Sequence, residues 1–272
     1  MVFRLNICVM EENDMLNQTY MNFANVLLHT PPDESGMREL TNVMFTLTDL
    51  EHNILAVRDI SPSYLLGELF WYFRGDNSLK FISEFSSFWN HLSDDGETCN
   101  SAYGYILQHK FGFNQIEKVI ELLKRDPGSR RAVLNINTPN EQMIETKDEP
   151  CTIAIQFFIR NEQLNCTAMM RSNDIWFGLP YDVAFFTELQ KYIAKRLNVS
   201  VGTYTHIDVS LHLYPRDFDK LKACYKTYSI SPPKQGFKVN VENLVKNLNI
   251  EITRENILNK CKQLGILTIE NF

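Results

Sequence analysis

The chain has 272 residues, 44% of them hydrophobic and 22% charged, with a formal net charge of −6 and an isoelectric point near 5.6. This length and composition suit one large domain or a domain with a small appendage, and the acidic balance argues against a surface that binds nucleic acid. No apolar run approaches the roughly 18 to 20 residues of a membrane span, and the N-terminal stretch turns acidic where a signal peptide needs an apolar core, so we expect a soluble, cytoplasmic protein.

The cysteines are spread along the chain without a CxxC pair or closely spaced histidines. This pattern indicates neither a zinc site nor a disulfide framework, and no metal is expected. We therefore expect reduced thiols, and the question is which one is reactive. The cysteines are Cys8, Cys99, Cys151, Cys166, Cys224 and Cys261.

The first thirty residues predict an opening helix. Apolar side chains recur at helical spacing from Met15 to Leu27, before the break at Pro31-Pro32. A short glycine-containing turn then leads into an expected strand over Val43–Thr48. Arg38 on this turn is open to two interpretations, because it could bind an anion or be an ordinary solvated arginine.

The next segment predicts a buried helix that contains one charge. Ser61 is a suitable N-cap with a proline in the first turn, and the helix over Tyr64–Phe73 is almost wholly apolar. Glu68 interrupts it. A buried carboxylate is costly unless it is paired or neutral, so Glu68 is either an ion-pair partner or a proton donor with a raised pKa.

An aromatic-rich segment follows and ends at Trp89, and it is either core packing or a wall on which a flat ligand stacks. Further on, Gln115–Lys124 predicts an amphipathic helix and Ala132–Asn137 a strand. Arg130 and Arg131 directly precede that strand. They could lie in solvent or clamp a phosphate, since a guanidinium offers paired donors to phosphate oxygens.

The stretch Cys151–Asp182 carries the densest chemistry in the chain. Cys151 follows a proline, two strand-like segments come next, and Arg171 precedes a buried-looking Asp182. A nucleophile, an anion binder and a carboxylate within about thirty residues are more than a structural hairpin requires. This stretch therefore predicts a functional site.

After this stretch, Val183–Leu197 predicts an amphipathic helix and Ile207–Tyr214 a strand. The strand places His212 and Tyr214 on one face. A lone histidine is usually a satisfied core group, but this pair also suits hydrogen bonding to sugar hydroxyls.

The tail from Ser229 differs from the rest. Pro232-Pro233 and Gly236 mark a linker, which is followed by short helical pieces. Strands and helices interleave along the whole chain without the regular alternation of a doubly wound fold, and no internal repeat is present. The pattern indicates a mixed α+β fold.

In order and spacing, a set of short motifs resembles the thymidylate synthase family over roughly residues 35–218. Each motif alone is weak, but the ordered set is highly specific. The resemblance implies a three-layer α+β fold whose large mixed sheet forms the interface of a homodimer. It also implies a catalytic domain over 1–225 and a divergent C-terminal extension over 226–272, packed on the same domain. The motifs are Glu68-Leu69-Phe70-Trp71 with Arg74-Gly75-Asp76, Tyr103-Gly104, Ser129-Arg130-Arg131, Pro150-Cys151, Gln156-Phe157, Arg171-Ser172 with Asp174, Gly178-Leu179-Pro180 and His212-Leu213-Tyr214.

In this family a cysteine thiolate adds to C6 of a pyrimidine nucleotide, and C5 then attacks the methylene carbon of methylenetetrahydrofolate. The resemblance implies Cys151 as the nucleophile, with Arg171 favouring its thiolate. Glu68 and Tyr103 would move protons through water, and Asp182 would read the base. The implied substrate-binding residues are Arg130 and Arg131 from the other subunit, Gln156, Ser172, Asn173, His212, Tyr214 and Arg38. The implied folate-binding residues are Trp89, Asp174 and Gly178.

The chain departs from thymidylate synthases at two positions. Thr152 stands where they have histidine, and Asp182 stands where they have asparagine. An asparagine amide can donate to the uracil C4 carbonyl and accept from N3–H, whereas a carboxylate accepts from the cytosine amino group. The change therefore predicts cytosine over uracil, by about 1 to 3 kcal/mol or roughly ten- to a hundred-fold.

Several motifs, including Cys151-Thr152 and Ser210-Leu211-His212, are similar to phage deoxycytidylate hydroxymethylases and to cytidylate hydroxymethylases of nucleoside antibiotic pathways. This resemblance implies a hydroxymethyl product with release of tetrahydrofolate, and Arg171-Ser172 favours dCMP. The alternatives are a CMP hydroxymethylase, an enzyme that methylates dUMP or dCMP, and an inactive relative that binds nucleotide or RNA.

Overall fold

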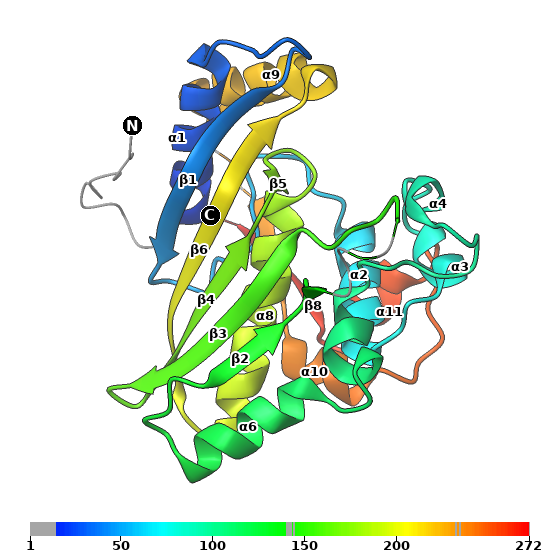
Figure 1. The fold of residues 1–272 in the computed structure, drawn as a ribbon. Helices are drawn as coiled ribbons and strands as arrows, with labels where there is room; N and C mark the ends of the chain where they lie inside the picture. Colours follow the sequence, from blue (N-terminus) through cyan, green and yellow to red (C-terminus); the bar gives the residue numbers. More distant parts are fainter. Residues whose placement is uncertain (1–14, 140–142, 144, 232, 234, 272) are drawn as a thin grey trace.

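The structure is a computed structural model that describes residues 15–139, 143, 145–231, 233 and 235–271. The first part of the expected opening helix and Pro232 of the expected linker lie outside these residues. In the described part of the chain, six strands form one mixed sheet (Figure 1): five follow the path β1-β6-β4-β3-β2, and β5 pairs with β6 off this path. The strands are β1 (Arg38–Leu47), β2 (Ala132–Asn135), β3 (Thr152–Arg160), β4 (Gln163–Met170), β5 (Asn173–Asp174) and β6 (Ser200–Leu213).

The sheet contains both antiparallel and parallel neighbours, a combination that local hairpins alone would not produce. β1 pairs antiparallel with β6, whereas β4 and β5 pair parallel with β6. β3 and β4 form a hairpin whose turn residues Asn161 and Glu162 have φ values of 52° and 61°, a backbone conformation that tight hairpins require. The sheet is mixed, as expected.

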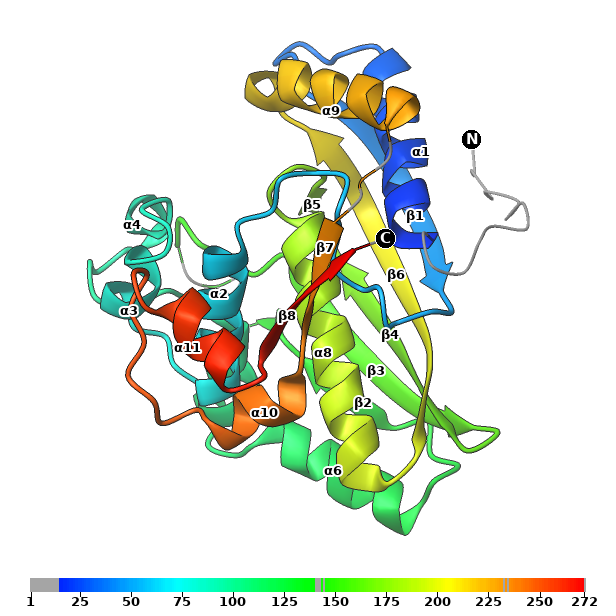
Figure 2. The same ribbon diagram turned by 180° about the vertical axis from the view of Figure 1, so that it is seen from behind.

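Some helices cover one face of the sheet, and others lie beside the sheet edge formed by β2 and β3. Helix α8 runs along the back of the sheet in Figure 1 and lies in front of it in Figure 2, and α1 and α9 pack together behind β1. The helices are α1 (Met15–His29), α2 (Pro62–Arg74), α3 (Leu79–Ser83), α4 (Trp89–Leu92), α5 (Tyr103–Tyr105), the π-helical turn η2 (Ile106–Lys110), α6 (Gln115–Arg125), α8 (Leu179–Leu197), the 3₁₀ turn η3 (Pro215–Asp217), α9 (Phe218–Ile230), α10 (Val241–Lys246) and α11 (Ile257–Gln263).

The predicted elements exist, but several bounds differ. The strand expected from Val43 begins at Arg38, because β1 pairs with β6 on both sides of Asn42, polar residues included. The helix expected from Val183 begins at Leu179, since proline is tolerated in a first turn, and Asp182 therefore lies on the helix. The strand expected over Ile207–Tyr214 runs from Ser200 to Leu213, so Tyr214 lies just beyond its end.

The C-terminal segment contains the expected short helices and also a hairpin that the sequence pattern did not reveal. β7 (Gln235–Val239) pairs antiparallel with β8 (Leu267–Asn271). The two strands are separated by both short helices, so no turn signal joins them. The segment packs against α8 through α10 and against α2 through α11 (Figure 2). Arg74 fixes it there by donating to the carbonyls of Leu248 and Ile250, both at 2.7 Å.

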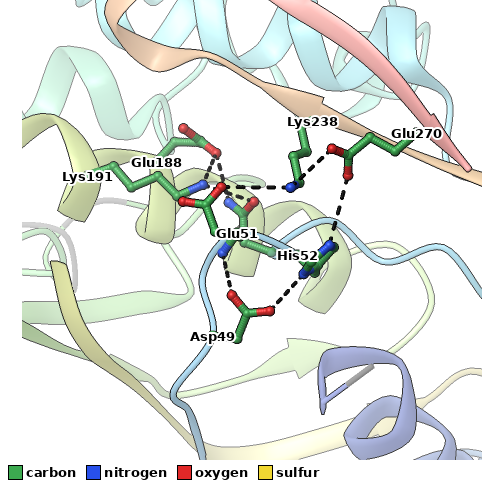
Figure 3. A network of polar contacts seen from close by, with 8 residues as sticks. Asp49, Glu51, His52, Glu188, Lys191, Lys238 and Glu270 are labelled. Carbon is green, nitrogen blue, oxygen red and sulfur yellow. Dashed lines mark hydrogen bonds and ion pairs between the residues drawn. The ribbon is translucent and has the colours of Figure 1, made fainter. Parts of the chain in front are cut away.

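A polar network fastens the hairpin to the loop that follows β1 (Figure 3). Lys238 Nζ lies 3.1 Å from Glu270 and 3.7 Å from Glu51, and His52 bridges Asp49 at 2.7 Å and Glu270 at 4.0 Å. Deeper in, the fully buried Glu188 of α8 accepts from Asn53 at 2.8 Å and from Lys191 at 3.0 Å. The hairpin, the loop and α8 are therefore held together. No helix of the described residues is both long and apolar enough to cross a bilayer.

Candidate active site

Cys151 lies directly before β3 and is half-buried, and Arg171 holds the loop that carries it. The backbone N–H of Arg171 donates to the Cys151 carbonyl at 2.9 Å. Its guanidinium donates to the carbonyls of Pro150 at 3.2 Å and Glu149 at 2.9 Å. Arg171 is therefore a clamp on the cysteine loop as well as a nearby charge.

The thiol of Cys151 is not a thiolate in the free protein. Burial raises the pKa of Cys151 to about 11, while the nearby Arg171 charge lowers it and the Asp182 charge raises it. The sequence-based expectation that Arg171 favours the thiolate is correct in direction. However, desolvation of the thiol outweighs the arginine.

Glu68 lies on α2 with its side chain buried, and its hydrogen-bond partners are tyrosines. The Tyr64 hydroxyl donates to Glu68 at 2.7 Å, and the Trp89 indole N–H donates to the Tyr64 oxygen at 3.2 Å. Burial raises the pKa of Glu68 to about 7, although hydrogen bonds from Tyr64 and Tyr72 lower it. Of the two interpretations, the proton donor is supported. Trp89 is buried against this group and meets Trp71 edge-on, with ring centroids 5.1 Å apart.

Tyr103 stacks on Tyr72 of α2, with ring centroids 5.5 Å apart. The stack depends on Gly104, because a Cβ atom there would come within 2.0 Å of the Tyr72 carbonyl oxygen. Burial raises the pKa of Tyr103 well above its usual value, and the charges of Asp182 and Cys151 raise it further. Tyr103 therefore lies near both groups as a neutral phenol.

Asp182 lies half-buried in the first turn of α8. Burial raises the pKa of its carboxyl well above the usual value, and the charges of Glu68 and Asp208 raise it further. Glu68 on α2, Asp182 on α8 and Asp208 on β6 thus form one group of interacting carboxyls. Tyr103 and Cys151 belong to the same neighbourhood, so the structure brings four sequence-predicted catalytic residues together.

Asp208 is a residue that the sequence analysis missed. It lies on a row of fully buried polar side chains along β6. Its Oδ1 is 3.0 Å from His206 Nε2, and the Tyr204 hydroxyl is 2.6 Å from His206 Nδ1. The signal was the alternation of Tyr204, His206 and Asp208. It was overlooked because the strand was expected to start only at Ile207.

The predicted substrate residue Asn173 belongs to this buried group. Its Nδ2 lies 3.2 Å from His206 Nε2, and its Oδ1 faces Gly178. A Cβ atom at Gly178 would lie 2.3 Å from that oxygen, so only glycine fits at the N-cap of α8. Ser172 is half-buried beside Arg171.

Asp174, His212 and Tyr214 lie together at the far end of β6. Asp174 accepts from the Trp176 backbone N–H at 2.8 Å and from Arg216 at 3.3 Å, and burial raises its pKa. The His212 ring is buried and meets Tyr214 edge-on, with centroids 4.8 Å apart. The expected side-by-side arrangement of this pair is confirmed.

The predicted phosphate-binding arginines are exposed at the start of β2. Arg131 is 3.9 Å from Asp126, and the carbonyl of Arg130 accepts from Gln156 at 2.9 Å. Arg38 is half-buried, with Nη1 donating to two α1-end carbonyls and its guanidinium 4.3 Å from the Phe218 ring centroid. It is therefore not an ordinary solvated arginine.

Arg58 is a second residue that the sequence analysis did not identify. It is buried, its guanidinium lies 4.6 Å from the Trp176 ring centroid, and its Nε and Nη1 have no hydrogen-bond partner among the described residues. A buried cation with free donors is costly unless a ligand uses it. In the same described part of the chain, no three His, Cys, Asp or Glu side chains gather as metal ligands.

Comparison with known proteins agrees with this geometry. The family model described as thymidylate synthase matches residues 33–257. The chain is 29% identical over 220 residues to the deoxyuridylate hydroxymethyltransferase of Bacillus phage SP01, covering 74% of this chain and 57% of the relative. It is 31% identical over 169 residues to the protein of the same name from Pseudomonas phage M6, covering 61% of this chain and 48% of the relative. The chain spans about half the length of these curated relatives.

Proposed function

Because this chain belongs to the thymidylate synthase family, we propose that it transfers a one-carbon unit from methylenetetrahydrofolate to C5 of a pyrimidine nucleoside monophosphate. We further propose that the product carries a hydroxymethyl group. The observation that carries this proposal is the cluster of Cys151, Glu68, Tyr103 and Asp182, with Arg171 clamping the cysteine loop. Both phage relatives are named as hydroxymethyltransferases, which supports the choice of group.

In this proposal Cys151 attacks C6 of the base and makes C5 nucleophilic. The free thiol holds its proton, so the attack requires a nearby acceptor for that proton. Glu68, with a pKa of about 7, is suited to exchange protons near neutral pH, and Tyr103 lies in the same neighbourhood. Arg171 and Ser172 would bind the phosphate.

The proposed substrate is dCMP, because the Asp182 carboxyl can accept from a cytosine amino group. The second candidate is dUMP, and the names of both phage relatives favour it. Arg171-Ser172, as noted above, favours a deoxynucleotide over CMP.

The other predicted substrate residues keep their proposed roles. His212 and Tyr214 would bind the sugar, since they present a paired histidine and phenol at one place. Asn173 would bind the substrate, and it also belongs to the buried group beside the N-terminus of α8. The remaining substrate-binding residues would be Gln156, which is half-buried, and Arg130 and Arg131, which are exposed. Arg38 would bind the phosphate in addition to the other arginines.

The residues near α8 fit a folate. Methylenetetrahydrofolate would supply the one-carbon unit, and it combines a flat ring with an anionic tail. Beside Trp176, Arg58 offers two buried donors that have no partner among the described residues, which suits the tail. The folate would contact Trp89, Asp174 and Gly178, as the family resemblance implies.

We also propose a homodimer built on the outer face of the sheet. No described helix covers this face in Figure 1. Three apolar side chains are aligned across neighbouring strands of this face, namely Met44 on β1, Ile207 on β6 and Met169 on β4. Met44 is 56% exposed and Met169 is 40% exposed. Such an apolar row suits a protein interface. Arg130 and Arg131 would reach the partner's nucleotide across it. A domain boundary near 225 stays a prediction, and the family match extends beyond it.

The test is a comparison of dCMP, CMP and dUMP, each incubated with the protein and methylenetetrahydrofolate, with product mass and absorbance recorded. We expect a hydroxymethylated nucleotide and no absorbance rise from dihydrofolate. An absorbance rise with a methyl product would contradict hydroxymethyl transfer. Cys151→Ala should abolish turnover. If no nucleotide is converted by the parent protein, the inactive binding relative is favoured instead.

A further inference from the structure

Asp148 joins the loop that carries Cys151 to the segment that carries Tyr103. It precedes Cys151 by three residues, and its side chain is buried, with only 6% exposed. Its Oδ2 accepts the backbone N–H of Ser101, two residues before Tyr103, at 2.8 Å. Its backbone carbonyl accepts from Asn100 Nδ2 at 3.1 Å. The loop before the cysteine is therefore hydrogen-bonded to the turn before the tyrosine.

The contact between Asp148 and Ser101 is buried at both ends. A buried N–H that loses its acceptor costs about 1 to 3 kcal/mol, whereas an exposed one turns to water without such a loss. The two segments therefore keep the spacing that this hydrogen bond requires. Asp148 acts as a spacer whose length is that of its side chain.

The other side of the cysteine loop is fixed to the sheet. Arg171 and Asn137 both donate to the Pro150 carbonyl, at 3.2 Å and 3.1 Å. Arg171 directly follows β4, and Asn137 lies just beyond β2. These contacts set the loop relative to the strands, whereas Asp148 sets it relative to the segment that carries Tyr103.

Tyr103 itself is held against helix α2. Its ring stacks on Tyr72, with centroids 5.5 Å apart. The backbone of Thr152, directly after Cys151, is among the groups that interact with the Tyr103 hydroxyl. The phenol is thus fixed on one segment and the thiol on the other. A shift between the two segments changes the separation of these two groups.

We propose that Asp148 is a positioning residue that sets the separation between the Cys151 thiol and the Tyr103 hydroxyl. It acts through the length of its side chain, because the Ser101 N–H needs only an oxygen at the right place. This inference rests on the proposed function, since it concerns two groups that are proposed to act in that reaction.

The experiment compares two substitutions that separate length from charge, with the nucleotide that the parent protein converts best. Asp148→Glu keeps the charge and adds one methylene, about 1.5 Å. Because a misplacement of about 1 Å can lower a rate about 10²-fold, kcat should fall about 10- to 100-fold. Both KM values should stay within about threefold, since the proposed nucleotide and folate ligands are unchanged. Asp148→Asn keeps the length and an oxygen acceptor, so its kcat should stay within about fivefold of that of the parent.

Asp94→Ala is the matched control on the same loop. Asp94 is exposed and accepts from the Thr146 hydroxyl at 2.5 Å and from the Lys147 backbone N–H at 3.0 Å. Its removal takes two hydrogen bonds from the loop but leaves the Asp148 contacts in place, so kcat should equal that of the parent. If Asp148→Glu does not fold, Asp148→Gln replaces it, because an uncharged side chain of the same length is less costly to bury.

An Asp148→Glu protein that turns over as fast as the parent would overturn the inference. So would the reverse order, in which Asp148→Asn loses activity and Asp148→Glu keeps it, because charge and not length would then matter. Loss of kcat in Asp94→Ala equal to that in Asp148→Glu would show a general effect of loosening the loop, and would overturn it as well.

Crystal structures of the parent and Asp148→Glu proteins test the positioning without turnover. We expect the distance from Cys151 Sγ to the Tyr103 hydroxyl oxygen to differ by about 1 Å between them. An unchanged distance would overturn the inference. If the distance changes but the parent converts no nucleotide, the proposed function fails alone.

Discussion

Replacement of Glu68 by glutamine tests whether this residue is a proton donor held neutral by burial. Glu68→Gln keeps the size of the side chain and an oxygen that accepts from Tyr64, but removes the titrating proton. Because proton transfer by a positioned side chain contributes about 10²- to 10⁴-fold to rate, turnover should fall by that factor. A structural role alone would leave turnover nearly unchanged.

The same substitution should alter how stability depends on pH. Below about pH 4.5, the folded and unfolded chains both hold the Glu68 proton. As pH rises from 4.5 to about 7, the unfolded chain releases this proton and the folded chain keeps it, so the folded protein loses stability. The loss levels off above about 7, and the whole shift corresponds to about 3 kcal/mol.

Denaturant unfolding of parent and Glu68→Gln proteins between about pH 5 and pH 8 measures this effect. The variant does not lose stability in this way. Between about pH 5 and pH 8 its free energy of unfolding should therefore rise relative to that of the parent by about 2 to 3 kcal/mol. Titrating groups that do not interact with Glu68 are common to both proteins and cancel in the difference. Parallel stability curves would refute the argument that Glu68 is held neutral in the folded protein.

Three other substitutions or treatments follow from the geometry. Because the pKa of Cys151 is about 11, the rate at which its thiol is alkylated in the free protein should rise about tenfold per pH unit through pH 9. Arg171→Gln should lower this rate at each pH, because the arginine charge lowers the pKa of the thiol. Mass spectrometry of the Cys151 peptide measures the rate. Gly178→Ala should destabilise the protein by about 1 to 3 kcal/mol in denaturant unfolding, because its Cβ atom would overlap the Asn173 carboxamide. Lys238→Met should lower the free energy of unfolding by about 1 kcal/mol or less, because the ion pairs of Lys238 are partly exposed. The difference should shrink in high salt.

Each of these expectations has a contrary outcome. An alkylation rate that levels off near pH 7 would mean a thiolate in the free protein. Gly128→Ala, where the nearest atom lies at 3.7 Å, is the matched control for Gly178→Ala, and equal stability of the two would show that α8 adjusts freely. A loss of several kcal/mol in Lys238→Met would mean that the hairpin network is far stronger than surface ion pairs are.

Much of the site could be predicted from short motifs. Cys151, Glu68, Tyr103 and Asp182 were identified from sequence, and they do lie in one neighbourhood. The helix N-cap at Ser61 and the single charge in a buried helix were also readable, because capping and periodicity are local properties. The β7–β8 hairpin was not predictable, since two helices separate its strands.

The sequence by itself determined the mixed fold and singled out Cys151 as the proposed nucleophile and Asp182 as the carboxyl proposed to face the base, because motif order and residue chemistry suffice for these. Only the tertiary structure decided how those groups are ionised. Burial outweighs Arg171 at Cys151, and α2, α8 and β6 bring three carboxyls together at Asp182. A pKa depends on desolvation and on charges from distant segments, and neither is written in the residues beside the group.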